Sequence, residues 1–523
     1  MSRKTGIPAD ELLEMADRRG AQEFRIRRRR FLQGGLALTA AMAANAFPRE
    51  GQRARAQTTP VLIVGAGIAG LTAAYRLSQA GVPVNVIEAK NRVGGRMQTL
   101  QKALSTPSIA ELGAEFIDTD HVCMRGLAEE LGFELVDLLA VEETLAVQDN
   151  YFFEGRRVPI AEIIRDYAPV AEQIDADLEA IDEFEDYTTP FPAVVELDNT
   201  SLSDYLDRIP NTTNTVRQII KVAYSTEYGL DPEEQSALNL LYLIGTEPEE
   251  FEILGTSDER FHVRGGNQQI LERLAQLVAG PVETGTVLEA IDSLPDGRYR
   301  VAVRSGTQRS DRFYERILLT LPFTTLREVR LDVDLPPLKA AAINNLRYAT
   351  NAKIITGYNE KIWRTRYNSR ANTYSDSSSY TNIWENAPSR YALPGQGLIT
   401  NFLGGTKGVA VGSATPQAHG DRLNFELERL FPGISAAAIP FQALRAYWPG
   451  EPFTRGSYLC YAPGDWTRFY GIEGERVGNI FFAGEHTSLE YQGWMEGGCE
   501  SGELAATEIL EDLGLTASSQ ALR

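Results

Sequence analysis

The stretch Val61-Leu62-Ile63-Val64-Gly65-Ala66-Gly67-Ile68-Ala69-Gly70 decides the fold of this 523-residue chain. Its first four residues are apolar and mostly β-branched, which predicts a buried parallel strand. Gly65, Gly67 and Gly70 then form G-x-G-x-x-G, with Ile68 and Ala69 between them, ahead of a helix-compatible segment. The first glycine permits a tight turn, the second lets the backbone approach a pyrophosphate, and the third lets the helix pack closely on the strand. The pattern therefore predicts a dinucleotide site at a helix N-terminus.

A second strand and an acidic residue complete this nucleotide-binding unit. Residues 84–87 are predicted to form the strand, and Glu88 with Ala89 follows directly. A carboxylate at this place accepts hydrogen bonds from ribose hydroxyls. The tripeptide Gly94-Gly95-Arg96 comes next. Two glycines let the backbone crowd a diphosphate and an arginine offsets its charge, so we expect Gly95 and Arg96 beside the phosphates.

The C-terminal part of the chain supplies two further motifs. These are Phe482-Ala483-Gly484-Glu485 and Gly493-Trp494-Met495, the second just before a predicted helix. Together with the N-terminal segment, they resemble the FAD-dependent amine oxidase family, which includes monoamine, polyamine and L-amino-acid oxidases. The resemblance implies FAD as cofactor. It also implies cofactor contacts from Val287, Gly484, Glu485, Trp494 and Met495, in addition to the N-terminal residues.

The resemblance implies an α/β fold in which a Rossmann-like FAD-binding domain is interleaved with an α+β substrate-binding domain and a helical insertion. Segments 155–257 are mostly helix-like, with Ile174, Leu178 and Ile181 at helical spacing and acidic residues between them. Those acids either form a solvated face or an acidic rim for cationic substrates. The expected boundaries are 57–118, 258–334 and 456–515 for the FAD-binding parts, 119–154 and 335–455 for the substrate-binding parts, and 155–257 for the insertion.

Residues 1–56 read as a targeting segment. A twin-arginine pattern lies in Arg27–Leu32, a mildly apolar stretch follows at Gly34–Ala46, and Ala54-Arg55-Ala56 offers a cleavage site. This order is that of a twin-arginine signal peptide. We therefore expect an exported, periplasmic protein. A disordered basic leader that binds an acidic partner is the alternative.

Charge and cysteine content narrow the partners. The leader carries twelve Lys or Arg and six Asp or Glu, a net of +6, so the total of −20 leaves −26 for the rest. Such a charge disfavours nucleic acid and anionic membranes and favours small cations. Cys123, Cys460 and Cys499 show no paired framework, so no disulfide scaffold is expected. The four histidines are scattered, so no metal site is expected. A homodimer is left open.

Three residues are expected to carry the chemistry, each matched to a family motif. Tyr458 and Trp494 correspond to the aromatic pair that orients a neutral amine at the flavin. Lys353, in Ala352-Lys353-Ile354-Ile355, corresponds to the lysine that holds a water near the reactive nitrogen. A buried lysine on a strand is costly without such a role; a surface lysine on an edge strand is the alternative. Ser457 stands where animal monoamine oxidases attach FAD through cysteine, so we expect non-covalent FAD.

The substrate is expected to be cationic. Phe116 stands where L-amino-acid oxidases clamp a carboxylate with arginine, and Arg364 is an unsupported replacement. Asp118 matches a position that meets a substrate nitrogen in polyamine oxidases, and Glu115 lies nearby. Both carboxylates could instead bond local backbone or Arg96. The leading expectation is oxidation of a basic L-amino acid, arginine or lysine, to keto acid, ammonia and hydrogen peroxide, with O2 as acceptor.

Several alternatives remain open. A polyamine or monoamine oxidase is a close second, and a quinone-linked amino-acid dehydrogenase would use the same site. A carotenoid-type desaturase or porphyrinogen oxidase shares the fold but acts on C–C bonds of large apolar substrates. A flavin-binding protein without catalysis would be expected to lack Lys353 or Trp494, and neither is missing.

Overall fold

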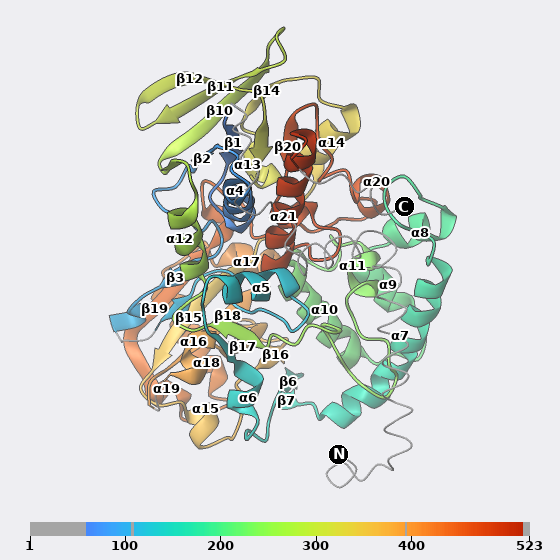
Figure 1. The fold of residues 1–523 in the computed structure, drawn as a ribbon. Coiled ribbons are helices and arrows are strands. Elements are labelled where there is room, and N and C mark those ends of the chain that lie inside the picture. Colours follow the sequence, from blue (N-terminus) through green and yellow to red (C-terminus); the bar gives the residue numbers. More distant parts are fainter. Residues whose placement is uncertain (1–58, 106–108, 393–394, 516–523) are drawn as a thin grey trace. The chain divides into compact units, whose positions relative to one another are not determined.

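The computed structural model describes residues 59–105, 109–392 and 395–515, and Figure 1 shows its fold. The described residues 59–78 and 82–509 belong to one compact unit, and residues 79–81 and 510–515 belong to another. The predicted leader, residues 1–56, lies outside the described residues. Within the described part, we find no helix whose length and hydropathy would let it span a bilayer.

A five-stranded parallel sheet joins segments from distant parts of the chain. Its order is β20-β13-β1-β2-β9. The strands are β1 (Val61–Val64), β2 (Val84–Ile87), β9 (Val282–Glu283), β13 (Ile317–Leu319) and β20 (Ile480–Phe482). All residues of β1, β13 and β20 are buried, as expected for parallel strands covered on both faces. The strand predicted over residues 61–64 is therefore confirmed as β1, at the centre of this sheet. β13 pairs with β1 on one side and with β20, the strand that leads into the C-terminal motif, on the other.

The glycine-rich turn connects β1 to helix α4 (Ile68–Gln79). Gly65 has a φ of +113°, which an L side chain rarely adopts. A Cβ on Gly70 would lie 2.1 Å from the carbonyl oxygen of Gly65. The third glycine thus lets the helix approach the strand, which is the role predicted for it.

A four-stranded mixed sheet, which contains one parallel pair, is visible at the top of Figure 1. Its order is β12-β11-β10-β14. The strands are β10 (Thr286–Ser293), β11 (Tyr299–Ser305), β12 (Gln308–Tyr314) and β14 (Arg330–Asp332). β10 begins directly after Gly285, and the amide of Thr286 donates to the carbonyl oxygen of Glu88 at 2.8 Å, which brings Val287 close to the nucleotide-binding segment.

A seven-stranded sheet forms the second large layer, in the order β19-β15-β18-β17-β16-β6-β7. Its strands are β6 (Asn150–Phe153), β7 (Arg156–Arg157), β15 (Ala352–Tyr358), β16 (Thr373–Ser375), β17 (Asn382–Glu385), β18 (Gly397–Leu403) and β19 (Ala438–Tyr447). β15, which carries Lys353, pairs with β18 on one side and β19 on the other. It is an interior strand with all seven residues buried, so the alternative of a surface lysine on an edge strand is wrong.

The predicted helical insertion is confirmed as a set of helices. They are α7 (Ile160–Ala180), α8 (Pro192–Asp198), α9 (Leu202–Arg208), α10 (Asn214–Tyr228) and α11 (Ala237–Leu241). Thr213 caps α10 by accepting a hydrogen bond from the amide of Val216, and Gly229 ends the helix in the left-handed conformation. The end of α10 matters below because Glu227 and Tyr228 lie there. The domain boundaries themselves stay a prediction.

The remaining described elements connect these layers. They are β3 (Thr99–Leu100), η2 (Ala103–Ser105), β4 (Ala110–Glu111), α5 (Val122–Glu130), β5 (Leu135–Asp137), α6 (Leu138–Glu142), β8 (Phe261–Val263), α12 (Gln268–Leu277), α13 (Phe323–Leu326), α14 (Pro337–Asn345), α15 (Ile362–Thr365), α16 (Ala387–Tyr391), α17 (Gly405–Ala410), α18 (Pro416–Leu427), α19 (Ile434–Ala437), η3 (Trp448–Gly450), α20 (Trp466–Phe469), η4 (Glu485–Thr487) and α21 (Met495–Asp512). The start of α21 directly after Trp494 confirms the predicted helix.

One disulfide joins α5 to α21, between Cys123 and Cys499. The sequence implied no disulfide scaffold, and it did not indicate this single bridge. The two cysteines are separated by 376 residues, so nothing in their spacing indicated that the fold brings them together. Cys460 is free and buried.

Candidate active site

One cavity of about 400 Å³ collects residues from both ends of the chain. Every site residue predicted from the sequence lines it, except Gly70 and Asp118. The cofactor candidates on its wall are Gly65, Gly67, Ile68, Ala69, Glu88, Ala89, Gly95, Arg96, Val287, Gly484, Glu485, Trp494 and Met495. The wall also includes Lys353, Tyr458, Glu115 and Phe116. The fold thus brings the predicted cofactor residues and the predicted catalytic residues into one space.

The nucleotide end of this cavity is built mainly from backbone. Oε2 of Glu88 accepts a hydrogen bond from the amide of Ala66 at 2.9 Å, and Oε1 accepts one from the amide of Lys90 at 2.8 Å. These bonds fix the carboxylate at the end of β2. A Cβ placed on Gly67 would meet no protein atom within 4 Å, so a side chain there would enter open space instead of the protein. The turn is therefore shaped to leave room for a group that is not part of the chain.

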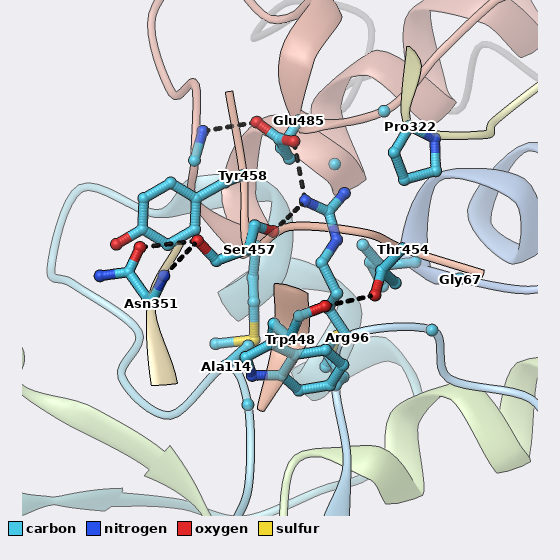
Figure 2. A pocket seen from close by; sticks show the side chains of 18 of the residues that line it. Gly67, Arg96, Ala114, Pro322, Asn351, Trp448, Thr454, Ser457, Tyr458 and Glu485 are labelled. Atoms are coloured by element: carbon cyan, nitrogen blue, oxygen red, sulfur yellow. Dashed lines mark hydrogen bonds and ion pairs between the residues drawn. The ribbon is translucent and has the colours of Figure 1, made fainter. Parts of the chain in front are cut away.

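An ion pair connects the N-terminal and C-terminal motifs. Nη1 of Arg96 lies 2.8 Å from Oε1 of Glu485 and donates to the carbonyl oxygen of Ser457 at 2.5 Å. Oε2 of Glu485 accepts from the amide of Gly493 at 2.9 Å. Figure 2 shows this chain of contacts, with Arg96 between Glu485 and Ser457. Glu485 is thus held by two partners, and it positions the turn that precedes Trp494.

The hydroxyl of Ser457, at the position considered for covalent attachment of the cofactor, is engaged within the protein. It donates to Oδ1 of Asn351 at 2.6 Å and is buried. Cys460, three residues on, is buried elsewhere and does not line the cavity. Among the described residues, no cysteine lies on the cavity wall.

Lys353 forms a buried ion pair with Glu115. Its Nζ lies 2.6 Å from Oε2 of Glu115 and donates to the carbonyl oxygen of Gly113 at 2.8 Å. Their side chains are 5% and 2% exposed. The other carboxylate oxygen, Oε1, accepts from Nε1 of Trp384 at 3.0 Å and from the amide of Ala387 at 2.6 Å. An ammonium group has three N–H donors, so one donor of Lys353 is left for a group in the cavity.

The two predicted aromatic residues lie on the cavity wall on different elements. Tyr458 donates its hydroxyl hydrogen bond to the backbone carbonyl oxygen of Glu227. Burial raises the pKa of Tyr458 well above its ordinary value, which keeps the phenol neutral. The ring of Trp494 packs edge-on against His121, with centroids 5.5 Å apart. Each ring thus lines the cavity and has a contact that fixes it, through Glu227 for Tyr458 and through His121 for Trp494.

Comparison with known proteins identifies the family. A family model described as "Flavin containing amine oxidoreductase" matches residues 68–510. The chain belongs to this family. Amine oxidase [flavin-containing] A of Sus scrofa is 26% identical over 466 residues, covering 87% of this chain and 85% of that protein. Amine oxidase [flavin-containing] B of Homo sapiens is 27% identical over 470 residues, with coverage of 87% and 86%.

Solved structures agree on the fold of the family. Cyclohexylamine oxidase from Brevibacterium oxydans IH-35A superposes with a TM-score of 0.74 at 22% identity, covering 87% of this chain and all of that one (100%). Wild-type putrescine oxidase bound to putrescine gives a TM-score of 0.72 at 20% identity, with coverage of 87% and 99%. At these identities the likeness concerns the fold.

FAD is the cofactor of this family, and the residues present fit it. The glycine turn at the N-terminus of α4 would hold the diphosphate, and the carboxylate of Glu88 would accept from ribose hydroxyls. Arg96 and Glu485 form the wall beyond. When bound, FAD supplies the acceptor for the two electrons removed from an amine. The chain's own part is to bind and orient that amine, to exclude water, and to hold a proton donor at Nζ of Lys353.

Asp118, expected at the substrate, lies elsewhere, and so does Arg364, which was named only as an unsupported replacement for the clamp. Asp118 is buried outside the cavity, where Oδ1 accepts from the amide of Glu259 at 3.0 Å. Burial raises its pKa to about 7. The amide of Glu259 lies 141 residues away in the sequence, so the bond is also not the one to local backbone that was the alternative considered for Asp118. Arg364 does not line the cavity either, because it is paired with Glu385 and Glu142, at 2.5 and 2.6 Å.

The acidic face predicted on the insertion is also absent from the cavity wall. None of the acids between 175 and 185 lines it, while α7 buries its apolar side, Ile163 and Ile174 among others. This agrees with a solvated amphipathic helix. The third N-terminal glycine, Gly70, supports packing and does not line the cavity.

Sequence reasoning missed the acids and amides at the substrate side. Glu227 lies in the last turn of α10 and Glu259 in the loop before β8, and both line the cavity. Asn382 and Tyr374 join them from neighbouring strands of the large sheet. One signal could have found Glu227, since a carboxylate in the last turn of a helix opposes the helix dipole. Glu259 gave no such signal.

Proposed function

We propose that the protein oxidises a small cationic amine that carries no carboxylate group. The observation that carries this proposal is the pairing of charges on the cavity wall. Four cationic side chains of the described residues line it, and each lies 2.6–3.0 Å from a carboxylate: Lys90 with Glu451, Arg96 with Glu485, Lys353 with Glu115, and Arg455 with Glu328. A substrate carboxylate would find the charge of each of them already paired with a carboxylate of the protein.

This pairing of charges favours a monoamine or polyamine oxidase, the second expectation from the sequence, over the oxidation of a basic L-amino acid, which was the first. A basic L-amino acid needs a cation for its carboxylate, because an unpaired buried charge is costly. The position of the arginine clamp holds Phe116, which is 9% exposed and packs against Trp384. A monoamine or polyamine has no such requirement.

The proposed reaction removes a hydride from the carbon next to nitrogen and a proton from the nitrogen, which leaves an imine. Water then hydrolyses the imine to an aldehyde and ammonia. The two electrons pass by way of FAD to O2, which takes up two protons and becomes hydrogen peroxide. Tyr458 and Trp494 orient the neutral amine between their faces, and the ammonium group of Lys353 holds a water or the substrate nitrogen at its remaining donor.

The test is anaerobic flavin bleaching by purified protein with a panel of alkylamines, diamines, arginine and lysine. We expect amines without a carboxylate to reduce the flavin and the amino acids not to do so. Reduction by arginine or lysine alone would refute the proposal. Peroxide formed on admission of air would distinguish the oxidase from a quinone-linked dehydrogenase.

We further propose that FAD is bound without a covalent bond, since the buried Ser457 hydroxyl is engaged by Asn351 and no described cysteine lines the cavity. Acid precipitation of the holoenzyme should release all flavin into the supernatant. Yellow colour that stays with the pellet would contradict this.

We also propose export by the twin-arginine route. The support besides the leader sequence is the Cys123–Cys499 disulfide, because disulfides persist mainly in oxidising compartments. Replacing Arg28 and Arg29 together by lysine keeps the charge and should abolish periplasmic activity in a bacterial host that has this export system. Unchanged export of the double variant would contradict the proposal. The homodimer stays a prediction, to be checked by light scattering.

A further inference from the structure

Two carboxylates on the cavity wall have no partner. Six glutamates line the cavity, and four of them are bonded to a cation or to backbone amides: Glu88, Glu115, Glu328 and Glu485. The other two, Glu227 and Glu259, form no hydrogen bond or ion pair through their carboxylates within the described residues. Every other charged side chain on the wall is thus bonded to an opposite charge or to backbone amides.

The two carboxylates lie near each other and near the aromatic residues. Glu227 is close enough to raise the pKa of Glu259, and it acts in the same sense on Tyr458 and Tyr374. Burial and neighbouring acids raise the pKa of each of the two carboxyl groups to about 7. The backbone carbonyl oxygen of Glu227 also accepts the Tyr458 hydroxyl, so Glu227 adjoins one of the two aromatic residues between which the reacting amine would lie.

The nearest arginines do not neutralise these acids. Arg390 and Arg370 lower the pKa of Glu259, yet neither lines the cavity. Both are directed to the buried Glu142, at 3.4 Å and 3.7 Å. On the other side, Asp118 adds negative charge and raises the pKa of Glu227. The local field is therefore one that attracts a cation.

A separate observation comes from the sheet beside the acids. Asn382 on β17 lies directly opposite Tyr374 on β16, and both side chains line the cavity. Asn382 is 5% exposed, and its amide nitrogen has no hydrogen-bond partner among the described residues. A buried amide without a partner is costly, so its place on a cavity wall indicates a polar ligand there. The amide oxygen and nitrogen exchange by a flip, so the side chain can accept from an ammonium group.

We infer that Glu227, Glu259 and Asn382 form a site for a second ammonium group of the substrate, so that the enzyme acts on diamines or polyamines. The inference rests on the proposed amine oxidation, since it places one nitrogen of the substrate between Tyr458 and Trp494. The other nitrogen lies at the two carboxylates. An ammonium group has three donors, which match two carboxylates and one amide oxygen. A carboxylate in the place of this second nitrogen is repelled by both glutamates.

The experiment compares α,ω-diaminoalkanes with n-alkylamines of the same chain length, as substrates of the FAD-loaded protein. Each pair differs only in the distal ammonium group. Removing one partner of a buried charge pair typically lowers affinity by about 30-fold or more. We therefore expect kcat/KM for the best diamine to exceed that for its monoamine by at least this factor.

Variants Glu227→Gln and Glu259→Gln test the residues directly, because they remove the charge and keep the shape. Each should lower kcat/KM for the diamine by about 30-fold or more and change that for the monoamine less than about threefold. Glu172→Gln, an exposed glutamate on α7, is the matched control for net charge and should change neither. If a variant fails to hold FAD, the comparison of matched substrates on the unaltered protein decides alone.

The failures are distinguishable. Equal kcat/KM for diamines and monoamines, or equal losses for both in the Gln variants, would overturn the second-ammonium site and leave amine oxidation standing. No bleaching by any amine, with FAD bound, would instead overturn the proposed function itself.

Discussion

The ion pair between Lys353 and Glu115 allows a test that separates structural support from chemistry. Lys353→Met removes the ammonium group and keeps an unbranched side chain of similar length. Glu115→Gln removes the carboxylate charge and keeps its shape. With the double variant, these form a double-mutant cycle, which isolates the interaction of the two groups.

The magnitudes follow from the contacts that each variant leaves behind. In Lys353→Met, a carboxylate 2% exposed keeps two donors, Nε1 of Trp384 and the amide of Ala387, but loses its cation. Leaving a buried charge without its partner costs about 3 to 5 kcal/mol of unfolding free energy. In Glu115→Gln, Lys353 keeps the carbonyl oxygen of Gly113 and gains an amide oxygen, so the loss is about 1 to 3 kcal/mol. The double variant has no unpaired charge, and we expect a coupling energy of about 2 kcal/mol.

Two assays measure the four proteins of this cycle. Urea unfolding at a fixed excess of FAD gives the free energies, and anaerobic stopped-flow gives the rate of flavin reduction by the best amine. The double variant should recover about 2 kcal/mol of the summed losses of the two single variants and none of the rate, because the donor at Nζ stays absent. A coupling energy below about 0.5 kcal/mol would refute the buried ion pair. Recovery of the reduction rate in the double variant would refute a role of Lys353 in the chemistry.

Three further predictions rest on other contacts. Replacing Cys123 and Cys499 by alanine removes the disulfide between α5 and α21 and should cost about 2 to 4 kcal/mol, measured as a lower urea midpoint; an unchanged midpoint would show that the bridge adds nothing. Gly67→Val places a side chain in open space, so the apoprotein should keep its circular dichroism while FAD titration shows lost binding; normal flavin content would contradict the phosphate cradle. Glu259→Gln should stabilise the protein by about 3 kcal/mol at pH 8 and hardly at pH 5. A carboxyl whose pKa rises from 4.5 to about 7 on folding destabilises only above 4.5, and fully above 7; a gain independent of pH would contradict this.

The parts predicted from the sequence are those that local backbone geometry determines. Gly65 needs a positive φ, Gly70 needs the absence of a Cβ, and Glu88 must follow the second strand, so each is readable within one short segment. The burial of Lys353 followed from the apolar residues around it on the strand. In these cases the sequence pattern and the tertiary environment impose the same requirement.

The parts that escaped prediction depend on packing between segments distant in the chain. Asp118 carries a suitable carboxylate in a suitable motif. In the fold, however, this carboxylate accepts a hydrogen bond from the amide of Glu259, 141 residues away, and lies outside the cavity. The partner of Cys123 lies 376 residues on. Glu259 has a φ of +45°, unusual for a residue other than glycine, and nothing in its sequence context indicates that conformation. No local pattern reports which of several acids ends without a partner.

The unpaired acids also bear on why the cavity has its present composition. Burying a carboxylate without a partner destabilises the folded chain, and the raised pKa of Glu227 and Glu259, about 7 each, expresses that penalty. All four cations on the same wall are paired with carboxylates, so the charged side chains without a partner among the described residues are Glu227 and Glu259. An apolar monoamine bound there would leave both carboxylates unpaired and would add further desolvation. A second ammonium group removes the penalty for both at once, since it gives each carboxylate a donor and lowers its pKa. The stability that these two carboxylates cost in the empty cavity is therefore regained when a dication binds. It is not regained when a ligand of equal size binds without a second charge.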